Sequence, residues 1–494
     1  MNHQPLVQRI HLDQAWPLFN TRETRAIERE AQGELPSHTL MQRAGLATAQ
    51  LALALTPHAH TIWIACGPGN NGGDGLEAAM HLKQWGKHPV VTWLGTPELT
   101  PPDAQQAWQR ATAAGVTFET TPPAQFDLAI DALLGLGCQR MPEGNIAQWL
   151  DVMHASGSPI LCVDTPSGLM SDTGQWLLKP KAPIAPTAQR HTLSLLTLKP
   201  GLFTADGRDA AGQVWFSDLG IESASQPTAW LQAGTALSIP RPHNSHKGSY
   251  GDVMVIGGTT GMTGAAVLAS TAALHGGAGR VMIGFLDDAD HTAVAAQHPA
   301  LMVRNVADLD FKHATIVCGC GGGDAVRAVL PRVLSTAAQL VLDADALNAM
   351  AQDPSLQRLL KTRHAKGQPT VLTPHPLEAA RMLGRTTAEV QMNRLEAAET
   401  LAQQTQSVVV LKGSGSIMAQ TGRTSVINPT GNPRLATAGT GDVLAGLIGA
   451  KLAQGDEAFL ASCEAVRTHG WVADRWDDAK GPAFDAAWLA ASVR

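Results

Sequence analysis

Short runs of β-branched and other apolar residues alternate along the chain with Ala- and Leu-rich stretches of helical periodicity. Each run ends where a Gly, Pro or Asp begins a loop, which is typical of a strand followed by a turn. In the first half the predicted strands are 61–66, 89–94, 128–131, 159–164 and 191–197. In the second half they are 253–257, 314–318, 340–343, 371–373 and 407–411. Strands that alternate with helices predict parallel sheets flanked by helices, so the fold class is α/β.

One segment interrupts this pattern. Residues 221–240, IESASQPTAWLQAGTALSIP, have weak periodicity and therefore form a candidate boundary. We expect two α/β domains, 1–222 and 223–494, which is consistent with the usual domain size for a chain of 494 residues.

Composition excludes several classes of protein. The net charge is −6 and there is no basic run, which argues against a nucleic-acid partner. No apolar stretch reaches the ~20 residues that span a bilayer, and the polar N-terminus does not resemble a secretory signal. The six cysteines have no framework spacing, and the C-x-C pair Cys318 and Cys320 has no further metal ligands nearby in the sequence. We therefore expect reduced thiols and a cytoplasmic enzyme.

Candidate chemistry in the first half lies where three predicted strands end. Residues 66–75 read CGPGNNGGDG, in which glycines allow a close backbone approach and the following helix offers N–H groups to an anion. The spacing is not that of GxGxxG, which disfavours a standard dehydrogenase. Asp131 and Asp164 end two further strands, as helix caps or as functional groups. Because the three loops meet at one edge of a parallel sheet, the functional interpretation is favoured, and oxygen ligands there suit a hard cation.

The first ~220 residues resemble the NAD(P)H-hydrate epimerase domain, a Rossmann-like three-layer fold. The motifs that carry the resemblance are LMQRAG (40–45), GNNGGDG (69–75), DALLGLG (131–137), VDTPSGL (163–169) and TLKPGL (197–202). It implies that the hydrated nucleotide contacts Asn70, Asn71, Gly72, Gly73, Asp74, Gly135, Leu136, Gly137, Cys138, Gln139, Arg140, Met141 and Asp164. It also implies potassium near Asn71, Asp131 and Ser167, while Asp164 and Lys199 are candidates for the acid and base.

The sequence departs from the epimerase pattern at three positions. Met80 stands where the family usually has Arg, and Leu134 and Leu136 replace its Phe and Thr. Since Arg and Thr would supply polar contacts, we expect the affinity of this half for its substrate to differ.

Near the C-terminus, residues 428–446 read NPTGNPRLATAGTGDVLAG, in which a Gly-rich turn opens a helix. Such a turn presents N–H groups to a phosphate, and Asp442 on the first helical turn is placed to take a hydroxyl proton. The helix macrodipole predicts that Asp442 is ionised. His375 in TPHP (373–376) is a candidate substrate contact, and Asp343 and Asp345 would either hold magnesium or cap a helix.

The order HKGSYG, GMTGAA, DADALN, TPHP, LKGSGS and GTGD is similar to the ADP-dependent NAD(P)H-hydrate dehydratase, a member of the ribokinase-like fold. The resemblance implies transfer of an ADP phosphate to the hydrate hydroxyl, then loss of phosphate. Residues carried over to the adenine nucleotide are Lys412, Gly413, Ser414, Gly415, Ser416 and Gly441. Those carried over to the hydrate are Ala265, Gly323, His375 and Asp442. The turn 318–323 reads CGCGGG and lacks the family's Pro and Leu, so we expect a looser turn.

Together the two halves predict a bifunctional repair enzyme. It would epimerise the R and S hydrates of NADH and NADPH (NADHX and NADPHX) and dehydrate the S form at the expense of ADP, with potassium and magnesium as cofactors. We expect small-molecule partners, no nucleic acid, no membrane and a homo-oligomer. Two alternatives stay open: a vitamin-precursor kinase of the same ribokinase-like fold, and a non-catalytic nucleotide-binding or scaffold protein.

Overall fold

The computed structural model describes residues 7–178, 189–233, 243–287, 291–477 and 483–493. The chain forms two compact units, Met1–His11 with Trp16–Trp230, and Leu12–Ala15 with Leu231–Arg494. Residues 234–240 of the candidate boundary segment lie outside the described residues, and the division into 1–222 and 223–494 stays a prediction.

The first unit is built on a sheet in the order β1-β9-β8-β7-β6-β3-β4-β5. Its strands are β1 (Gln8–Arg9), β3 (Thr61–Cys66), β4 (His88–Trp93), β5 (Thr117–Glu119), β6 (Leu128–Ala132), β7 (Ile160–Val163), β8 (Arg190–Leu195) and β9 (Gln213–Ser217). All pairs are parallel except β1 with β9. The five strands predicted for this half are confirmed to within two residues at either end. Since β7, β6 and β3 are neighbours, their loops do meet at one edge.

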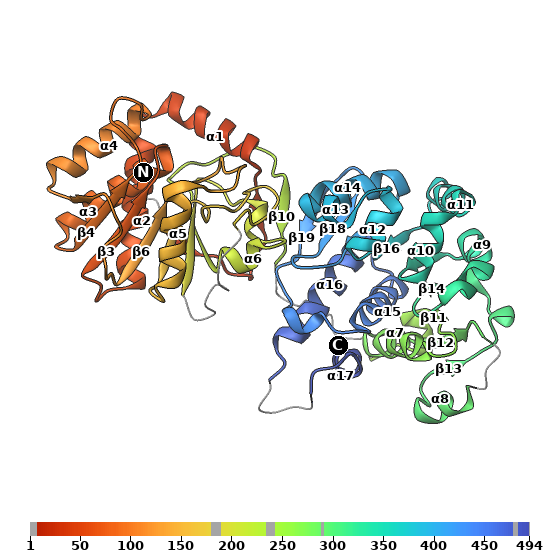
Figure 1. The fold of residues 1–494 in the computed structure, drawn as a ribbon. Coiled ribbons are helices and arrows are strands. Elements are labelled where there is room, and N and C mark those ends of the chain that lie inside the picture. Colours follow the sequence, from red (N-terminus) through yellow and green to blue (C-terminus); the bar gives the residue numbers. More distant parts are fainter. Residues whose placement is uncertain (1–6, 179–188, 234–242, 288–290, 478–482, 494) are drawn as a thin grey trace. The chain divides into compact units, whose positions relative to one another are not determined.

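Helices cover both faces of this sheet (Figure 1). They are α1 (Thr21–Glu34), α2 (Thr39–Leu55), α3 (Asn70–Gln84), α4 (Pro102–Ala113), α5 (Gly144–Ala155) and α6 (Gly207–Ala210). Along β3, Ile62 and Ile64 join the core that contains residues of α2, α3 and α4, while Trp63 joins a second core with Trp149 of α5. Successive strand residues point to opposite faces, so helix, sheet and helix form the predicted three layers.

The second unit contains a longer sheet whose order from one end is β13-β12-β11-β14-β15-β16-β17-β18-β19. These strands are β13 (Met302–Val303), β12 (Arg280–Phe285), β11 (Asp252–Gly257), β14 (Thr315–Cys318), β15 (Gln339–Leu342), β16 (Thr370–Leu372), β17 (Val408–Leu411), β18 (Ile417–Gln420) and β19 (Arg423–Ile427). Pairing is parallel from β13 to β17 and antiparallel from β17 to β19. The five predicted strands are confirmed. Two more short strands, β2 (Trp16–Leu18) and β10 (Ala229–Leu231), lie near the unit boundaries in the sequence.

Helices α7 (Thr263–His275), α15 (Thr440–Ala453) and α16 (Ala458–Asp474) share one hydrophobic core with the sheet residues Val253 and Val255. The intervening Met254 and Ile256 are buried as well, so the sheet is covered on both faces. The other helices of this unit are α8 (Thr292–Gln297), α9 (Val326–Thr336), α10 (Asp345–Gln352), α11 (Pro354–Ala365), α12 (Pro376–Leu383), α13 (Thr387–Met392), α14 (Arg394–Thr405) and α17 (Ala486–Ser492). Among the described residues, no helix combines the length and apolarity needed to cross a bilayer.

The close packing of α15 against α7 depends on Gly446. A Cβ added to Gly446 would lie 1.9 Å from the backbone oxygen of Ala269. We expect Gly446→Ala to lower the free energy of unfolding of the second unit by about 1–3 kcal/mol, because the two helices must move apart. Denaturant unfolding would measure this change.

Gly264 offers a matched control on α7, since nothing lies within 4 Å of an added Cβ there. We expect Gly264→Ala to raise stability by about 0.5–1 kcal/mol through helix propensity. If both variants had the same stability, close packing at Gly446 would not be the reason for its glycine.

Candidate active sites

The first unit has a pocket of about 530 Å³ at the edge where β3, β6 and β7 end. Asn70, Asn71 and Asp74 line it from the loop and helix after β3, Gly135 from the loop after β6, and Asp164 from the end of β7. The three loops singled out in the sequence therefore surround one cavity.

The GNNGGDG motif is helical, in contrast to the predicted Gly-rich loop. Helix α3 begins at Asn70, with Gly69 as its N-cap. The glycines allow close packing of this helix: an added Cβ on Gly72 would lie 2.0 Å from the oxygen of Gly67, and one on Gly73 would lie 2.6 Å from Met41. The pocket thus faces the first turn of α3, whose N–H groups have no partner within the helix and can bind an anion.

The loop predicted to hold the nucleotide, residues 135–141, is divided in the structure. Gly135, Leu136, Gly137 and Cys138 line the pocket. Gln139, Arg140 and Met141 are exposed and are not part of the pocket lining. Leu134 and Leu136 both line it, and Leu136 in place of Thr makes this wall more apolar. Met80 is 3% exposed in the hydrophobic core instead, so the departure at this position affects packing.

The three residues predicted to bind potassium occupy neighbouring positions around the loop 133–135. Asn71 lines the pocket, and its buried side-chain amide has no hydrogen-bond partner among the described residues. Asp131 is buried, and its carboxylate accepts from the Ser167 hydroxyl at 2.5 Å and from the Ser167 N–H at 2.9 Å. The Ser167 hydroxyl oxygen in turn accepts from the N–H of Leu134 at 2.8 Å. Asp131 and Ser167 lie behind the pocket wall, since neither is part of its lining.

Asp164 and Lys199 form an ion pair at the base of the pocket. The side chain of Lys199 is fully buried and donates to Asp164 and to the backbone oxygen of Leu195 at 2.7 Å. Asp164 has φ of 65°, a left-handed conformation that Asp tolerates better than most residues. The ion pair with buried Lys199 fixes the orientation of the Asp164 carboxylate.

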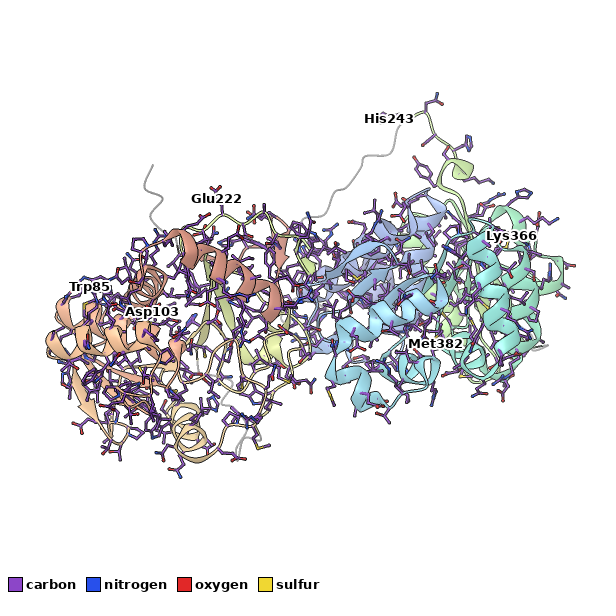
Figure 2. The ribbon with its side chains drawn as sticks, turned by 90° about the horizontal axis from the view of Figure 1, so that it is seen from above. Trp85, Asp103, Glu222, His243, Lys366 and Met382 are labelled. Atoms are coloured by element: carbon purple, nitrogen blue, oxygen red, sulfur yellow. The ribbon has the colours of Figure 1, made fainter. Side chains whose placement is uncertain are left out.

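Sequence reasoning missed the wall formed by α1 and the start of α4. One face of α1 lines the pocket with four side chains at the i, i+1, i+4, i+8 spacing of a helix face: Thr24, Arg25, Glu28 and Gln32. Asp103 lines it from the first turn of α4 (Figure 2). A polar stripe with this spacing was the available signal in the sequence.

In the second unit, Asp442 lies on the first turn of α15 after Gly439, as predicted. Gly439 has φ of 90°, which only glycine adopts readily. The preference of the macrodipole for ionised Asp442 is opposed by its surroundings, although a pKa of about 6 leaves Asp442 mostly ionised at neutral pH. Burial, together with the nearby charge of Asp343, raises the pKa of Asp442 to about 6. Asp442 is therefore close to its titration midpoint in mildly acidic solution.

Asp343 takes part in a buried network at the end of β15. Its carboxylate accepts from Lys412 at 2.7 Å and from the hydroxyl of Thr373 at 2.7 Å. Burial lowers the pKa of Lys412, but the carboxylates of Asp343 and Glu378 raise it by more, so that its pKa lies above the ordinary value. Lys412 is thus a fixed cation at this edge of the sheet.

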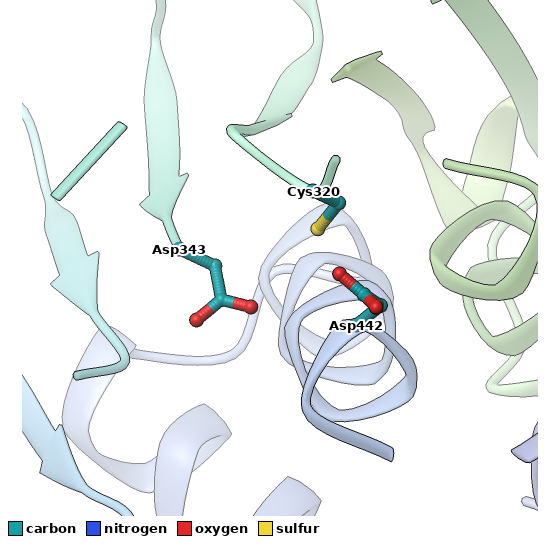
Figure 3. Close-up of side chains that lie close together, drawn as sticks. All are labelled: Cys320, Asp343 and Asp442. Atoms are coloured by element: carbon teal, nitrogen blue, oxygen red, sulfur yellow. The ribbon is translucent and has the colours of Figure 1, made fainter. Parts of the chain in front are cut away.

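Cys320 lies against Asp442 and Asp343, and one side-chain atom of each residue lies within 4.8 Å of the other two (Figure 3). The sequence shows no further ligands close to the C-x-C pair, but the fold brings Asp343 and Asp442, which are far apart in the sequence, beside Cys320. Burial raises the pKa of the Cys320 thiol well above its ordinary value, so it is a neutral group that hydrogen-bonds Asp442. Lys412 already compensates Asp343, which disfavours a metal ion held by these three residues.

The turn 318–323 is tightly packed, contrary to the expectation of a loose turn. Gly319 and Gly321 have φ of 118° and 62°, and added Cβ atoms would lie 2.0 Å from the oxygen of Asp343 and 2.6 Å from the oxygen of Met262. The N–H of Gly323 donates to Asp345 at 2.8 Å. Ala265 of α7 lies against Gly321. Glycines thus replace the family's Pro and Leu by allowing close backbone contacts.

His375 caps α12, and its Nδ1 accepts from the N–H groups of Leu377 and Glu378. Its ring is 45% exposed, so one edge is accessible to a ligand. Burial raises the pKa of Glu378 to about 7. His375 and Glu378 thus form a pair of titratable side chains close to Lys412.

The predicted nucleotide contacts gather at the end of β17. Buried Arg394 donates to the backbone oxygens of Leu411 and Lys412 and holds this strand end in place. Gly413, with φ of 137°, begins the loop that continues through Ser414, Gly415 and Ser416. A Cβ on Gly441 would lie 3.2 Å from the Lys412 ammonium. Lys412 therefore lies beside the first turn of α15, where a cation, helix N–H groups and the Asp442 carboxylate come close together.

Comparisons with known proteins agree with this arrangement. Residues 253–493 match the family described as NAD(P)H-hydrate dehydratase, and residues 37–201 match the family described as YjeF-related protein N-terminus. The bifunctional NAD(P)H-hydrate repair enzyme Nnr of Escherichia coli is 34% identical over 473 residues, which cover 90% of this chain and 87% of that protein. The chain belongs to the family of bifunctional NAD(P)H-hydrate repair enzymes.

Other relatives correspond to part of this repair enzyme. The ADP-dependent (S)-NAD(P)H-hydrate dehydratase of Neisseria meningitidis is 41% identical over 251 residues, covering 49% of this chain and 83% of that protein. The ADP/ATP-dependent NAD(P)H-hydrate dehydratase of Bacillus subtilis, co-crystallised with ATP/Mg²⁺, is 32% identical and covers 51% of this chain and 91% of that chain, with a TM-score of 0.45. The two matched families fall one in each compact unit of the chain.

Proposed function

We propose that this repair enzyme interconverts the R and S hydrates of NADH and NADPH in its first unit. The second unit dehydrates the S hydrate with ADP and releases NAD(P)H, AMP and phosphate. The observation that carries the proposal is the presence of both sites in one chain of this family: the Asp164–Lys199 pocket and the Lys412–Asp442 phosphate site.

In the dehydratase site, the chemistry follows from the charges of named groups. Lys412 and the N–H groups at Gly441 stabilise the negative charge on the phosphate that moves. Asp442 takes the proton of the hydrate hydroxyl as this oxygen attacks the phosphorus. His375 contacts the hydrate from α12. The phosphate then leaves C6 with the oxygen of the former hydroxyl while C5 loses a proton, so that the C5=C6 double bond of the dihydronicotinamide reforms.

Magnesium fits this site together with the nucleotide. Mg²⁺ binds phosphate oxygens and one or two carboxylates. Both residues considered for it in the sequence are engaged, Asp343 with Lys412 and Asp345 with the N–H of Gly323. Mg²⁺ bound to the phosphates of ADP would neutralise part of their charge beside Lys412.

Potassium fits the oxygen-rich region around Asn71, Asp131 and Ser167. The buried amide oxygen of Asn71 has no hydrogen-bond partner among the described residues, and a weakly hydrated cation would satisfy it. The carboxylate of buried Asp131 would balance the charge. We propose that potassium holds the loop that begins at Gly135 against the substrate.

Two separate reactions test the proposal. The purified R hydrate of NADH, incubated with potassium but no nucleotide, should convert to the S hydrate faster than it does spontaneously, as followed by chromatography. The purified S hydrate, incubated with ADP and Mg²⁺, should give NADH, AMP and phosphate in equal amounts. A stable phosphorylated product from a hydroxymethylpyrimidine would instead favour the vitamin-precursor kinase.

The pH dependence of dehydration provides a further prediction. Because Asp442 acts as a base, we expect the rate to fall as pH drops through its pKa of about 6. The hydrogen bond from Cys320 lowers this pKa, so Cys320→Ala should move the acid limb of kcat/KM to higher pH. Cys318→Ala, at the neighbouring buried thiol, serves as a control and should leave the limb unchanged. An acid limb that stays in place in Cys320→Ala would contradict the hydrogen bond's role.

Localisation and assembly are also part of the proposal. All six cysteines are free and buried, which supports a reducing compartment and a cytoplasmic enzyme. We expect a homo-oligomer, which sedimentation of the purified protein would test.

A further inference from the structure

Helix α1 is fixed to the epimerase pocket by a buried polar contact. The Thr24 hydroxyl lies 2.8 Å from that of Thr197, two residues before Lys199 in the loop after β8. At its start, the Asn20 side chain caps the helix, and the N–H and hydroxyl of Thr21 both donate to Asp172. The contacts at its first turns therefore define which face of α1 is presented to the cavity.

Glu28 lies one turn after Thr24 on this face and lines the pocket. It is half-buried, and within the part of the chain that the structure describes its carboxylate makes no hydrogen bond or ion pair. A carboxylate that is neither fully solvated nor paired is costly when charged. This makes Glu28 different from Asp164, which is held by Lys199 in the same pocket.

The charges around Glu28 come from several elements. Asp164 follows the end of β7, and Lys199 lies in the loop after β8. Arg25 is on α1 and Asp103 is on α4. Burial raises the pKa of Glu28, the charge of Asp164 raises it further, and Lys199 and Arg25 lower it in part.

Asp74 on α3 is a further acid in this pocket. Its pKa is raised well above the ordinary value, first by burial and then by Asp164 and Glu28. The pocket thus combines two carboxyl groups whose pKa values are raised, Glu28 and Asp74, with a carboxylate, Asp164, that is paired with a lysine. Carboxyl groups in such different environments can divide acid and base roles in enzyme sites.

Epimerisation at C6 of the hydrate requires such a combination. The hydroxyl on C6 leaves as water when an acid protonates it, while the N1 lone pair forms a C6=N1 double bond. Water then adds to the opposite face of C6, the double bond returns to N1 as a lone pair, and a base takes the proton of the added water. One proton is given and one is taken, so no oxidant or reductant is needed.

We propose that Glu28 is a second catalytic residue of the epimerase pocket, which donates the proton to the leaving hydroxyl while Asp164 accepts the proton of the incoming water. The two carboxyl groups come from different walls of the cavity, α1 and the end of β7. In the reverse direction they exchange roles. This inference rests on the proposed epimerase function.

The test uses the full-length protein and the purified R hydrate of NADH with potassium. Glu28→Gln keeps the size of the side chain and removes the acid, so we expect epimerisation to slow by about 10²-fold or more. Glu30→Gln, an exposed position on the same helix, is the matched control and should be unchanged. Dehydration of the S hydrate with ADP, measured in the same samples, should be unaffected in both variants. Epimerisation by Glu28→Gln at the wild-type rate would overturn the inference.

A pH profile separates a catalytic from a structural role. In the wild type, kcat/KM for epimerisation should fall as pH rises through the pKa of Glu28, because the proton donor is lost. Glu28→Gln should lack this alkaline limb. Glu28→Asp should regain part of the rate, with the limb at lower pH because Asp is the stronger acid. A slower Glu28→Gln whose alkaline limb is unchanged would contradict the role. Absence of epimerisation in the wild type would instead overturn the epimerase assignment itself.

Discussion

Replacing Asp442 with Asn should lower the rate of ADP-dependent dehydration by about 10²–10⁴-fold while leaving epimerisation unchanged. Asn keeps the size and the helix-capping ability of Asp but cannot take a proton from the hydrate hydroxyl. Asp442, the proposed base, lies beside Lys412 and Gly441 at the N-terminus of α15. Release of NADH from the S hydrate, followed by near-ultraviolet absorbance, measures the effect.

Asp456→Asn is a suitable control for this variant, since Asp456 is exposed just beyond the other end of α15. It should dehydrate the S hydrate at the wild-type rate. Dehydration retained by Asp442→Asn would remove Asp442 from the base role, and Glu378, with a pKa raised to about 7 by burial, would be the next candidate.

The second large effect is expected at Asp164. Asp164→Asn should reduce epimerisation by about 10²–10⁴-fold, because the base is lost. It should also lower the stability of the first unit by about 3–5 kcal/mol, since Lys199 would remain buried without its partner charge. Asn tolerates the left-handed φ of 65° at this position, so backbone strain does not add to the effect.

Two measurements separate these consequences. Denaturant unfolding gives the change in stability, and epimerisation is then compared at a temperature where the variant is folded. Lys199→Met should also destabilise the unit, because Asp164 loses its cation. A folded Asp164→Asn protein that epimerises at the wild-type rate would show that Asp164 binds or orients and does not transfer the proton.

Much of the fold could be predicted because its strands are continuous β-branched runs that end at Gly, Pro or Asp. The edge that carries the first pocket follows from parallel pairing, since the loops after β3, β6 and β7 must meet. Strand β12 was missed because Gly284, its fifth residue, cuts the apolar run short, and β9 because only two of its five residues are buried.

The errors have a common physical origin in tertiary packing. GNNGGDG is a poor helix sequence by propensity, yet Gly72 and Gly73 are needed where α3 approaches Gly67 and Met41. The pKa of Asp442 is raised by its burial and by the charge of Asp343, neither of which its position on the helix reveals. Cys320 and Asp442 are adjacent only because β14 and α15 are packed together. No local pattern reports contacts between such distant residues.

Glu28 was missed for a different reason. The face of α1 that lines the pocket carries Thr24, Glu28 and Gln32, a polar stripe that is also typical of a solvated helix surface. Only the position of α1 over the cavity, fixed by the contact of Thr24 with Thr197, distinguishes the two interpretations.

The most direct test of the bifunctional assignment uses an equal mixture of the R and S hydrates of NADH with the purified protein, ADP, Mg²⁺ and potassium. The near-ultraviolet absorbance of the reformed dihydronicotinamide is followed to completion. We predict recovery of the whole mixture as NADH, because epimerisation supplies the S hydrate that dehydration consumes. Recovery of the S portion alone, beyond slow spontaneous exchange, would contradict the epimerase half, and no recovery with ADP or ATP would contradict the assignment as a whole.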